Sequence, residues 1–216
     1  MGRAKEIQLK VIPSKIASDF VKKHHYSGKV VPNSTLHFGC FLDGKLHGVM
    51  QYGPSMNKKG TIKLVHGTKW NEFIELNRMA FDDYLPKYSE SRCIGVSINM
   101  IKKNAPHIKW IISFSDGGQC GDGTIYRASN FKLTDIRHSK SLRINPNTGE
   151  TWHAMQAHHL KKDNDFRTWK PVDGYQLRYI YLIDKKARLT VPIMPFSKID
   201  EIGAGMYKGE KRNMRE

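Results

Sequence analysis

An arginine and an aspartate each stand near the end of an apolar run that predicts a buried strand. Arg78 lies in the second half of the run Phe73–Phe81, and Asp116 follows the run at 108–114. A guanidinium can bind phosphate or carboxyl oxygens through two parallel hydrogen bonds, and a carboxylate can orient or deprotonate an amine. These two residues therefore indicate a site that holds an anionic group and activates a nucleophile.

Structural roles are open for the same two residues. Arg78 has acidic residues nearby in the sequence, namely Asp82, Asp83 and Glu90, and an ion pair with one of them would leave it with no chemical task. Asp116 precedes a glycine-rich loop and is also a candidate cap for that loop. The residue types alone do not separate these alternatives.

The start of a predicted helix at 89–103 is a candidate anion site. Its first residues are Ser89, Glu90 and Ser91. The first amides of a helix have no partner inside the helix and point towards its N-terminus, where they attract negative charge. These residues either hold the anionic part of a donor molecule or simply begin the helix.

The charge of the chain favours a polyanionic partner. Its 216 residues include 36 Lys and Arg against 20 Asp and Glu, which gives a formal charge of +16. An excess of this size attracts nucleic acid. The candidate phosphate contacts are Lys132, Arg137, Lys140 and Arg143, for which an ordinary solvated basic face is an equally good interpretation.

Cysteine use and hydropathy place the protein in a broad class. Cys40, Cys93 and Cys120 are scattered and form no C-x-x-C pair, which is typical of free thiols in a reducing cytoplasm. No apolar run of about 18 residues is present, so we expect no membrane partner. The first ten residues lack the apolar stretch of a secretory signal. We expect a cytoplasmic protein with a packed core.

Hydropathy periodicity and turn residues predict the elements that position these side chains. Asp43-Gly44 between two β-rich runs is a strong hairpin signal. The segment 150–162 fits either a helix or a strand. Strands are predicted over 6–12, 35–42, 45–52, 73–81, 108–114, 131–137 and 177–182, and helices over 15–24, 89–103 and 124–130.

The order of these elements predicts an α/β fold with a central mixed sheet of about six or seven strands flanked by helices. A right-handed crossover through the helix at 89–103 makes the strands at 73–81 and 108–114 parallel neighbours. Ligands bind outside the carboxyl ends of such strands, where Arg78 and Asp116 lie. We expect one domain over residues 1–196 and a basic C-terminal tail over 197–216.

Several motifs resemble known families. The element order and GTIYRASNF (residues 123–131) resemble GNAT-type acyltransferases. A longer set of strings resembles the phage Mom family, and it spans about residues 20–135. In chain order they are HHYS (24–27), FLDGKLHGVMQYGP (41–54), ELNR (75–78), LPKYSESR (85–92) and WIISFSDGGQCGDGTIYRASNF (110–131).

The resemblance implies a fold and an activity. A GNAT-like fold implies that the fourth and fifth strands splay apart around an acyl-CoA or a related donor. Resemblance to the Mom family implies a transferase that converts adenine in phage DNA to a carbamoylmethyl-adenine at the exocyclic amine, and so protects the DNA from restriction. Double-stranded DNA is then the partner. The loop before Ser89 has no glycine, unlike the usual GNAT pyrophosphate loop.

The resemblance also implies roles for single residues. Asp116 would act as the base or orient the amine, Arg78 would anchor the donor, and Tyr126 would protonate the leaving group. Tyr26 would belong to the catalytic site, and His25 is a candidate ligand for a divalent metal such as iron. The structural alternatives are a core position for Tyr126 and a helix-end position for His25 that interacts with the helix dipole.

Two other functions fit the same residues. One is a GNAT-like acyl-CoA acyltransferase that acts on a protein or a small amine. The other is a non-catalytic DNA-binding module on a transferase fold. Retention of DNA binding with loss of modification after substitution of Arg78 or Asp116 would separate the enzyme from the module.

Overall fold

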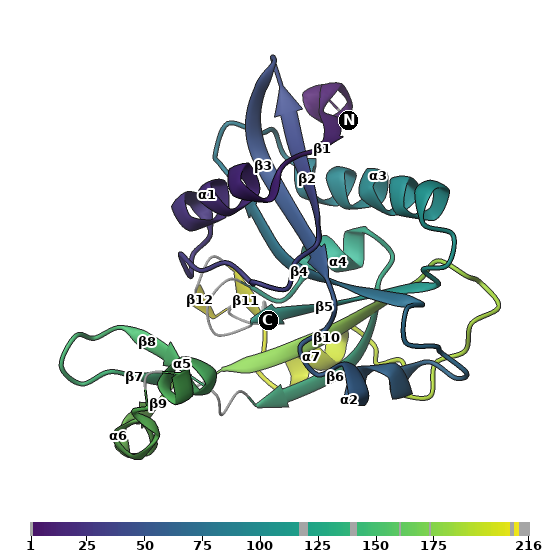
Figure 1. Cartoon of the computed structure of the whole chain (residues 1–216). Helices are drawn as coiled ribbons and strands as arrows, with labels where there is room; N and C mark the ends of the chain where they lie inside the picture. The colour runs from purple at the N-terminus through teal and green to yellow at the C-terminus, as the bar shows by residue number, and fades with distance from the viewer. Residues whose placement is uncertain are drawn as a thin grey trace. The chain divides into compact units, whose positions relative to one another are not determined.

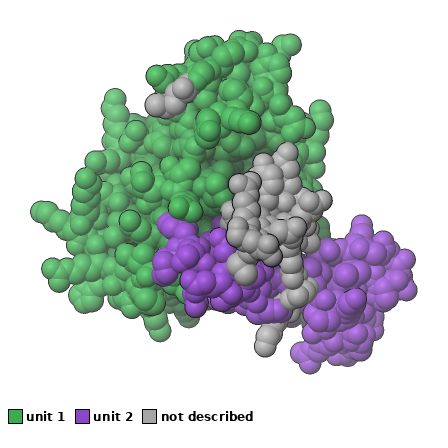
Figure 2. Space-filling view, turned by 180° about the vertical axis from the view of Figure 1, so that it is seen from behind, with its two compact units in different colours: residues 1–114, 123–134, 178–194 green, residues 115–122, 135–177, 195–216 purple. Residues whose placement is uncertain are grey.

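The computed structural model describes residues 2–116, 121–138, 142–159, 161–172, 174–207 and 210–211. Cys120 and Lys140 lie outside these ranges. Backbone contacts divide the chain into two compact units, which Figure 2 colours separately. Unit 1 comprises residues 1–114, 123–134 and 178–194, and unit 2 comprises residues 115–122, 135–177 and 195–216. The predicted domain boundary after residue 196 stays a prediction.

A seven-stranded mixed sheet is the central element, as predicted (Figure 1). β1 to β4 pair with antiparallel neighbours, and β4 and β5 are parallel. The parallel pair confirms the predicted crossover through α3 (Ser89–Asn104). In spatial order the strands are β1 (Gln8–Val11), β2 (Leu36–Leu42), β3 (Lys45–Gly53), β4 (Phe73–Phe81), β5 (Trp110–Asp116), β10 (Tyr175–Leu182) and β6 (Lys132–His138).

Two helices cover opposite faces of the first strands in unit 1. α1 (Ser14–His24) packs Ala17 and Val21 against Val49 of β3. On the other face the hydroxyl of Tyr52 lies 2.6 Å from that of Ser97 in α3. Val49 and Tyr52 are three positions apart in one strand and therefore point to opposite faces. Each helix therefore packs one apolar side against one face of the sheet, which explains the apolar spacing that predicted both helices.

The remaining elements are short. In unit 2, α5 (Ala154–His159) and α6 (Asp163–Thr168) pack Ala157 and Phe166 with the following Trp169 into a small apolar cluster. The strands β7, β8 and β9 form a separate three-stranded sheet in the order β8-β7-β9. The bounds are η1 (Arg3–Glu6), α2 (Lys58–Thr61), η2 (Ile62–Leu64), α4 (Thr124–Ala128), β7 (Leu142–Ile144), β8 (Thr151–His153), α5 (Ala154–His159), α6 (Asp163–Thr168), β9 (Lys170–Pro171), α7 (Ser197–Glu201), β11 (Met206–Tyr207) and β12 (Glu210–Lys211).

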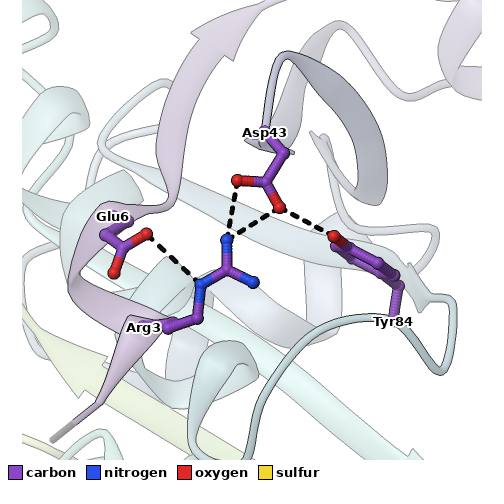
Figure 3. A network of polar contacts seen from close by, with 4 residues as sticks. All are labelled: Arg3, Glu6, Asp43 and Tyr84. Carbon is purple, nitrogen blue, oxygen red and sulfur yellow. Dashed lines mark hydrogen bonds and ion pairs between the residues drawn. The ribbon is translucent and has the colours of Figure 1, made fainter.

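A polar network holds the turn of the β2–β3 hairpin (Figure 3). Asp43 and Gly44 both have positive φ, as the predicted turn requires. Arg3 Nη2 donates to both carboxylate oxygens of Asp43 at 2.6 and 2.7 Å, and the Tyr84 hydroxyl donates to the same carboxylate at 2.7 Å. Arg3 Nε also reaches Glu6 at 3.4 Å. The network therefore ties the loop before α3 to the hairpin.

Some elements were not predicted. The segment 150–162, which fitted either a helix or a strand, contains both β8 and α5. β10 inserts between β5 and β6, an arrangement set by tertiary packing rather than by local pattern. In the described part of the chain no helix is both long and apolar enough to cross a membrane.

Candidate functional site

A β-bulge in β4 creates the candidate site in unit 1. Arg78 pairs with Gln51 of β3, but the next pair joins Leu76 to Tyr52, so Asn77 is an extra residue. Residues three apart in a regular strand point to opposite faces, and one inserted residue reverses that relation. Glu75 and Arg78 therefore lie on the same face of β4, the face that α1 covers.

Glu75 is the acidic group of this site. Its side chain is partly buried, and burial raises the pKa of its carboxyl above the ordinary value. The Ser55 and Asn77 side chains and the charge of Arg78 offset this only in part. A carboxylate whose pKa is raised above its ordinary value is a better proton acceptor than an ordinary surface carboxylate.

Arg78 is held by backbone oxygens rather than by an acidic partner. Its Nε donates to the Lys29 carbonyl at 3.1 Å, and its Nη1 donates to the Asn77 carbonyl at 2.9 Å. No ion pair links it to Asp82, Asp83 or Glu90 in the described ranges. Two of its five N–H donors are used, so the others remain for a ligand.

His25 lies beside Arg78 as a neutral ring. Burial, followed by the positive charge of Arg78, lowers the pKa of the imidazole to about 4. Nδ1 accepts the Ser27 backbone N–H at 3.1 Å and lies 2.8 Å from the Ser27 hydroxyl, which leaves the proton on Nε2. His25 caps the C-terminal end of α1, which is the helix-end position of the structural alternative, and its lowered pKa leaves the helix dipole little positive charge to act on.

The ionisation of His25 gives a direct test of this geometry. In a pH titration of the histidine ring signals by NMR, His25 will stay neutral down to about pH 4. In Arg78→Met the pKa of His25 will rise, because a nearby positive charge no longer opposes protonation. A wild-type value near the ordinary 6.5, or no change in the variant, would contradict this placement.

Buried polar side chains surround the Glu75–Arg78 pair. Gln51 and His37 are paired across β2 and β3, with Gln51 Nε2 3.2 Å from His37 Nδ1. Asn77 Oδ1 accepts from the Ser34 hydroxyl at 3.1 Å. Gln51 Oε1 and Asn77 Nδ2 are buried, and neither makes a well-aligned hydrogen bond within the described residues. Such groups are costly in a core and common at functional sites.

Gly53 is required by the close approach of two segments at this site. A Cβ on Gly53 would lie 2.5 Å from the Asn33 carbonyl oxygen and 2.7 Å from both Asn77 Oδ1 and Ser34 Cα. Gly53→Ala should therefore cost about 1–3 kcal/mol in chemical denaturation, because backbone must move.

Gly95→Ala in α3 is the matched control for that substitution. No atom lies within 4 Å of a Cβ built there, and alanine is the better helix former. We expect no loss of stability in this control. Equal stability of the Gly53→Ala variant and the wild type would show that the segment at residues 33–34 is not fixed as described.

The strands β4 and β5 separate next to this site. Their parallel pairing ends at Leu76 and Ser113. The Ser113 hydroxyl lies 2.8 Å from the hydroxyl of Tyr126, which is buried and stacks on Tyr179. Ser113 pairs with Leu76, which points to the face of the sheet opposite to Glu75, so Tyr126 approaches the separation of the strands from the side of α3. The convergence of Tyr126 with Arg78 stays a prediction.

The start of α3 offers backbone amides rather than hydroxyl groups. Ser89 is buried and donates its hydroxyl proton to the Pro86 carbonyl, and the Ser91 hydroxyl donates to the Tyr88 carbonyl. Tyr88, an exposed residue with φ of 72°, occupies the capping position before the helix. Serine, threonine, asparagine or aspartate is usually found at such a position. The amides of Glu90 and Ser91 meet no acceptor within the described residues, so they can bind an anion.

The other predicted catalytic residues lie as follows. Tyr26 is exposed, and its ring centroid is 4.3 Å from that of His25. Asp116 is the last residue of β5 and is partly buried. It belongs to unit 2, whereas Arg78 belongs to unit 1. The convergence of Asp116 on Arg78 stays a prediction.

The predicted DNA contacts differ in their surroundings. Lys132 is exposed, and Arg137 is exposed but paired with Asp135 at 2.8 Å. Arg143 donates to the Trp169 carbonyl and lies over the Phe166 ring, so it is committed to the small core of unit 2. Lys140 is not among the described residues. Their contact with DNA stays a prediction.

A metal centre does not form around His25 in the part of the chain that the structure describes. No group of three His, Cys, Asp or Glu side chains that could hold a metal ion is present there. His25 Nδ1 is engaged by Ser27. The described residues thus do not fit a metal site of this kind, and no chemical step below depends on one.

Glu75 and Gln51 were not predicted as site residues. Both lie in strands, where a polar residue normally faces solvent. The sequence signal that could have identified Glu75 is the pair of polar residues Asn77 and Arg78 inside an otherwise alternating strand. That irregularity is the sequence trace of the bulge.

Comparison of the sequence with known proteins shows similarity to one family over most of the chain. The model of the Mom protein family matches residues 6–198. Methylcarbamoylase mom of Escherichia phage Mu is 31% identical in an alignment of 194 residues that covers 86% of this chain and 79% of that protein.

Solved acetyltransferase structures share the fold. The ribosomal-protein-S5-alanine acetyltransferase from Vibrio fischeri superposes with a TM-score of 0.50 at 14% identity, over 83% of this chain and 94% of that one. A GNAT family acetyltransferase from Elizabethkingia anophelis with acetyl-CoA bound has a TM-score of 0.47 at 12% identity, over 82% of this chain and 98% of that one. The predicted GNAT-like fold is confirmed.

Proposed function

The chain belongs to the Mom protein family, and we propose that it transfers a carbamoylmethyl group to the exocyclic amine of adenine in DNA. The observation that carries this proposal is the 31% identity to methylcarbamoylase mom over 86% of the chain. The basic charge of +16 supports DNA as the substrate. The chain would then act in the cytoplasm of the host cell, where phage DNA is accessible.

The adenine must leave the duplex before it can react. Its amine is base-paired in DNA, and extrusion of the base costs a few kcal/mol. The buried polar groups of Gln51 and Asn77 suit a base edge better than they suit hydrocarbon, because hydrogen bonds to a purine would satisfy them. Asn and Gln are the side chains that commonly pair with adenine.

We assign proton removal to Glu75. The adenine amine is a weak nucleophile because its lone pair is delocalised into the ring. As the nitrogen forms a bond to the donor carbon, the bond from that carbon to its leaving group breaks and the amine loses a proton. Glu75 accepts this proton, since its raised pKa matches the task better than an ordinary carboxylate.

The donor would lie between the separating ends of β4 and β5. Arg78 would bind an oxygen of the donor with its remaining N–H groups, and the Glu90 and Ser91 amides would bind an anionic part. Acyl-CoA or a related donor has such groups. For a carbamoylmethyl product the bond that breaks must join the methylene carbon of the donor to its leaving group, because attack on a thioester carbonyl would give an N-acyl adenine. Tyr126, which faces Ser113 at this separation, would protonate the leaving group.

Nucleoside analysis tests the proposal. DNA from cells that express the chain is digested to nucleosides, and their masses are measured by mass spectrometry. We expect a modified deoxyadenosine heavier by one carbamoylmethyl group. Ordinary deoxyadenosine alone, with folded protein present, would contradict the proposal. Acetyl-CoA-dependent labelling of a peptide or small amine by the same protein would favour the acyltransferase alternative.

A further inference from the structure

The charge of the chain is concentrated in one unit. Unit 1 has 24 Lys and Arg against nine Asp and Glu, a formal charge of +15, whereas unit 2 has 12 against 11, a charge of +1. Unit 1 is the green body in Figure 2. A polyanion is attracted to the surface where uncompensated positive charge lies. The surface that binds a polyanion should therefore be sought in unit 1.

Two segments of unit 1 gather a large share of this charge. Residues 58–70 and 185–190 contain seven Lys and Arg and no Asp or Glu. The segments run side by side: Val65 bridges to Leu189, the His66 amide donates to the Arg188 carbonyl at 2.8 Å, and the Thr190 amide donates to the Leu64 carbonyl at 3.0 Å. We call this surface the basic platform. Its cationic residues are Lys58, Lys59, Lys63, Lys69, Lys185, Lys186 and Arg188.

The platform is fixed by the core beneath it. Val65 packs with Phe73 and Trp110 in a buried cluster, and Leu64 and Leu189 pack against the same cluster. The Trp110 Nε1 donates to the Thr68 hydroxyl at 3.1 Å. The backbone under the lysines is therefore ordered before any ligand binds, which lowers the entropy cost of binding.

The positive charge of the platform is largely uncompensated in the described part of the chain, although the charge of Lys69 acts on the Glu72 carboxyl. None of the seven forms an ion pair with a carboxylate in the described residues. The acidic residues that flank the two segments are already engaged: Glu72 pairs with Lys109 at 2.7 Å, and Asp184 accepts the Lys186 amide at 2.9 Å. Lys58 lies 4.4 Å from the ring centroid of Trp70, an exposed indole that can contact a sugar or a base.

The platform also connects to the candidate site. The Thr61 hydroxyl of α2 lies 3.0 Å from that of Ser55, and Ser55 contacts the Glu75 carboxyl. A duplex lying on the platform would thus be close to the group that receives the proton. We propose that the basic platform binds the phosphate backbone of duplex DNA and presents the adenine to the site. This inference rests on the proposed function.

Binding of a fluorescein-labelled duplex at several salt concentrations tests the platform. We expect Lys59→Gln, Lys63→Gln, Lys185→Gln and Lys186→Gln together to weaken binding at least about tenfold at moderate salt. The slope of log affinity against log salt should fall by about 0.9 for each phosphate that the variant no longer neutralises. At saturating DNA the modification rate should recover, because the catalytic groups are unchanged.

Matched variants make the result specific. Lys5→Gln, Lys45→Gln, Lys102→Gln and Lys103→Gln remove the same charge from exposed positions of unit 1 outside the platform. We expect these to weaken binding much less. Equal losses of affinity in both quadruple variants would overturn the platform, and so would a larger loss after neutralising Arg137, Lys161, Lys162 and Arg167 of unit 2.

Nucleoside analysis of the wild type separates the two possible failures. If wild-type protein modifies DNA and the platform variant binds DNA as tightly, the platform is wrong and the proposed function stands. If wild-type protein neither binds nor modifies DNA, the proposed function fails and the platform with it.

Discussion

Replacing Glu75 by glutamine will reduce adenine modification by about 100-fold or more while leaving DNA affinity unchanged. Glutamine has nearly the same shape and keeps the neighbours of Glu75 in place, but it cannot accept a proton. General bases typically contribute about 10²–10⁴-fold to a rate. The rate of modified nucleoside formation and the affinity for labelled duplex, measured on the same preparations, check this.

The pH profile distinguishes a base from a structural residue. Glu75 must be ionised to accept a proton, so the wild-type rate should rise with pH through a value above the ordinary 4.5 of a glutamate. The residual rate of Glu75→Gln should lack this rise. The same profile in both proteins would contradict the assignment.

Stability should change in the opposite direction to activity. The pKa of Glu75 is raised in the folded state, so the fold favours the protonated form, and ionisation destabilises it as pH rises. Glu75→Gln should therefore be as stable as the wild type at neutral pH, or more stable. Glu72→Gln is the control: Glu72 pairs with Lys109, which lowers its pKa, so this change should reduce stability and spare the chemistry.

Replacing Arg78 by methionine will also abolish most of the modification, by about 100-fold or more. Methionine fills similar volume but removes the N–H groups that would hold the donor. Arg78→Lys keeps the charge and loses the planar fork, so we expect it to recover little activity. Rates at increasing donor concentration check this, since loss of an anchor raises the donor concentration needed.

Arg3→Met is the control for the arginine substitution. Arg3 pairs with Asp43 and Glu6 at exposed positions, but it lies outside the site. Its loss should leave the rate per folded molecule unchanged. A similar loss of rate in Arg3→Met and Arg78→Met would mean that Arg78 acts through stability rather than through the donor.

Local signals predicted most of the elements of the fold. The Asp43-Gly44 turn, the apolar spacing of α1 and α3 and the parallel β4–β5 pair are all present as expected, because short-range sterics and burial determine them. The place of β10 between β5 and β6 was not predicted. Strand order depends on contacts between segments distant in sequence, and no local pattern encodes it.

The candidate site was predicted only in part. Arg78 could be predicted as a site residue, because an arginine within the apolar run of a buried strand is unusual and is visible in the sequence. Glu75 was missed because regular alternation places it on the other face from Arg78, and only the extra residue Asn77 reverses this. The Ser89 hydroxyl is engaged by the Pro86 carbonyl, a contact set by the loop that no local pattern predicted.

Photo-crosslinking tests most directly the central claim that the target adenine binds at the site of unit 1 around Glu75 and Arg78. Duplex DNA that the wild type modifies is made with a photoreactive adenine analogue at the target position and irradiated in complex with the protein. Mass mapping of the crosslinked peptides should find segments 25–34, 51–61 or 73–81. Crosslinks confined to residues 142–172 of unit 2 would contradict the account.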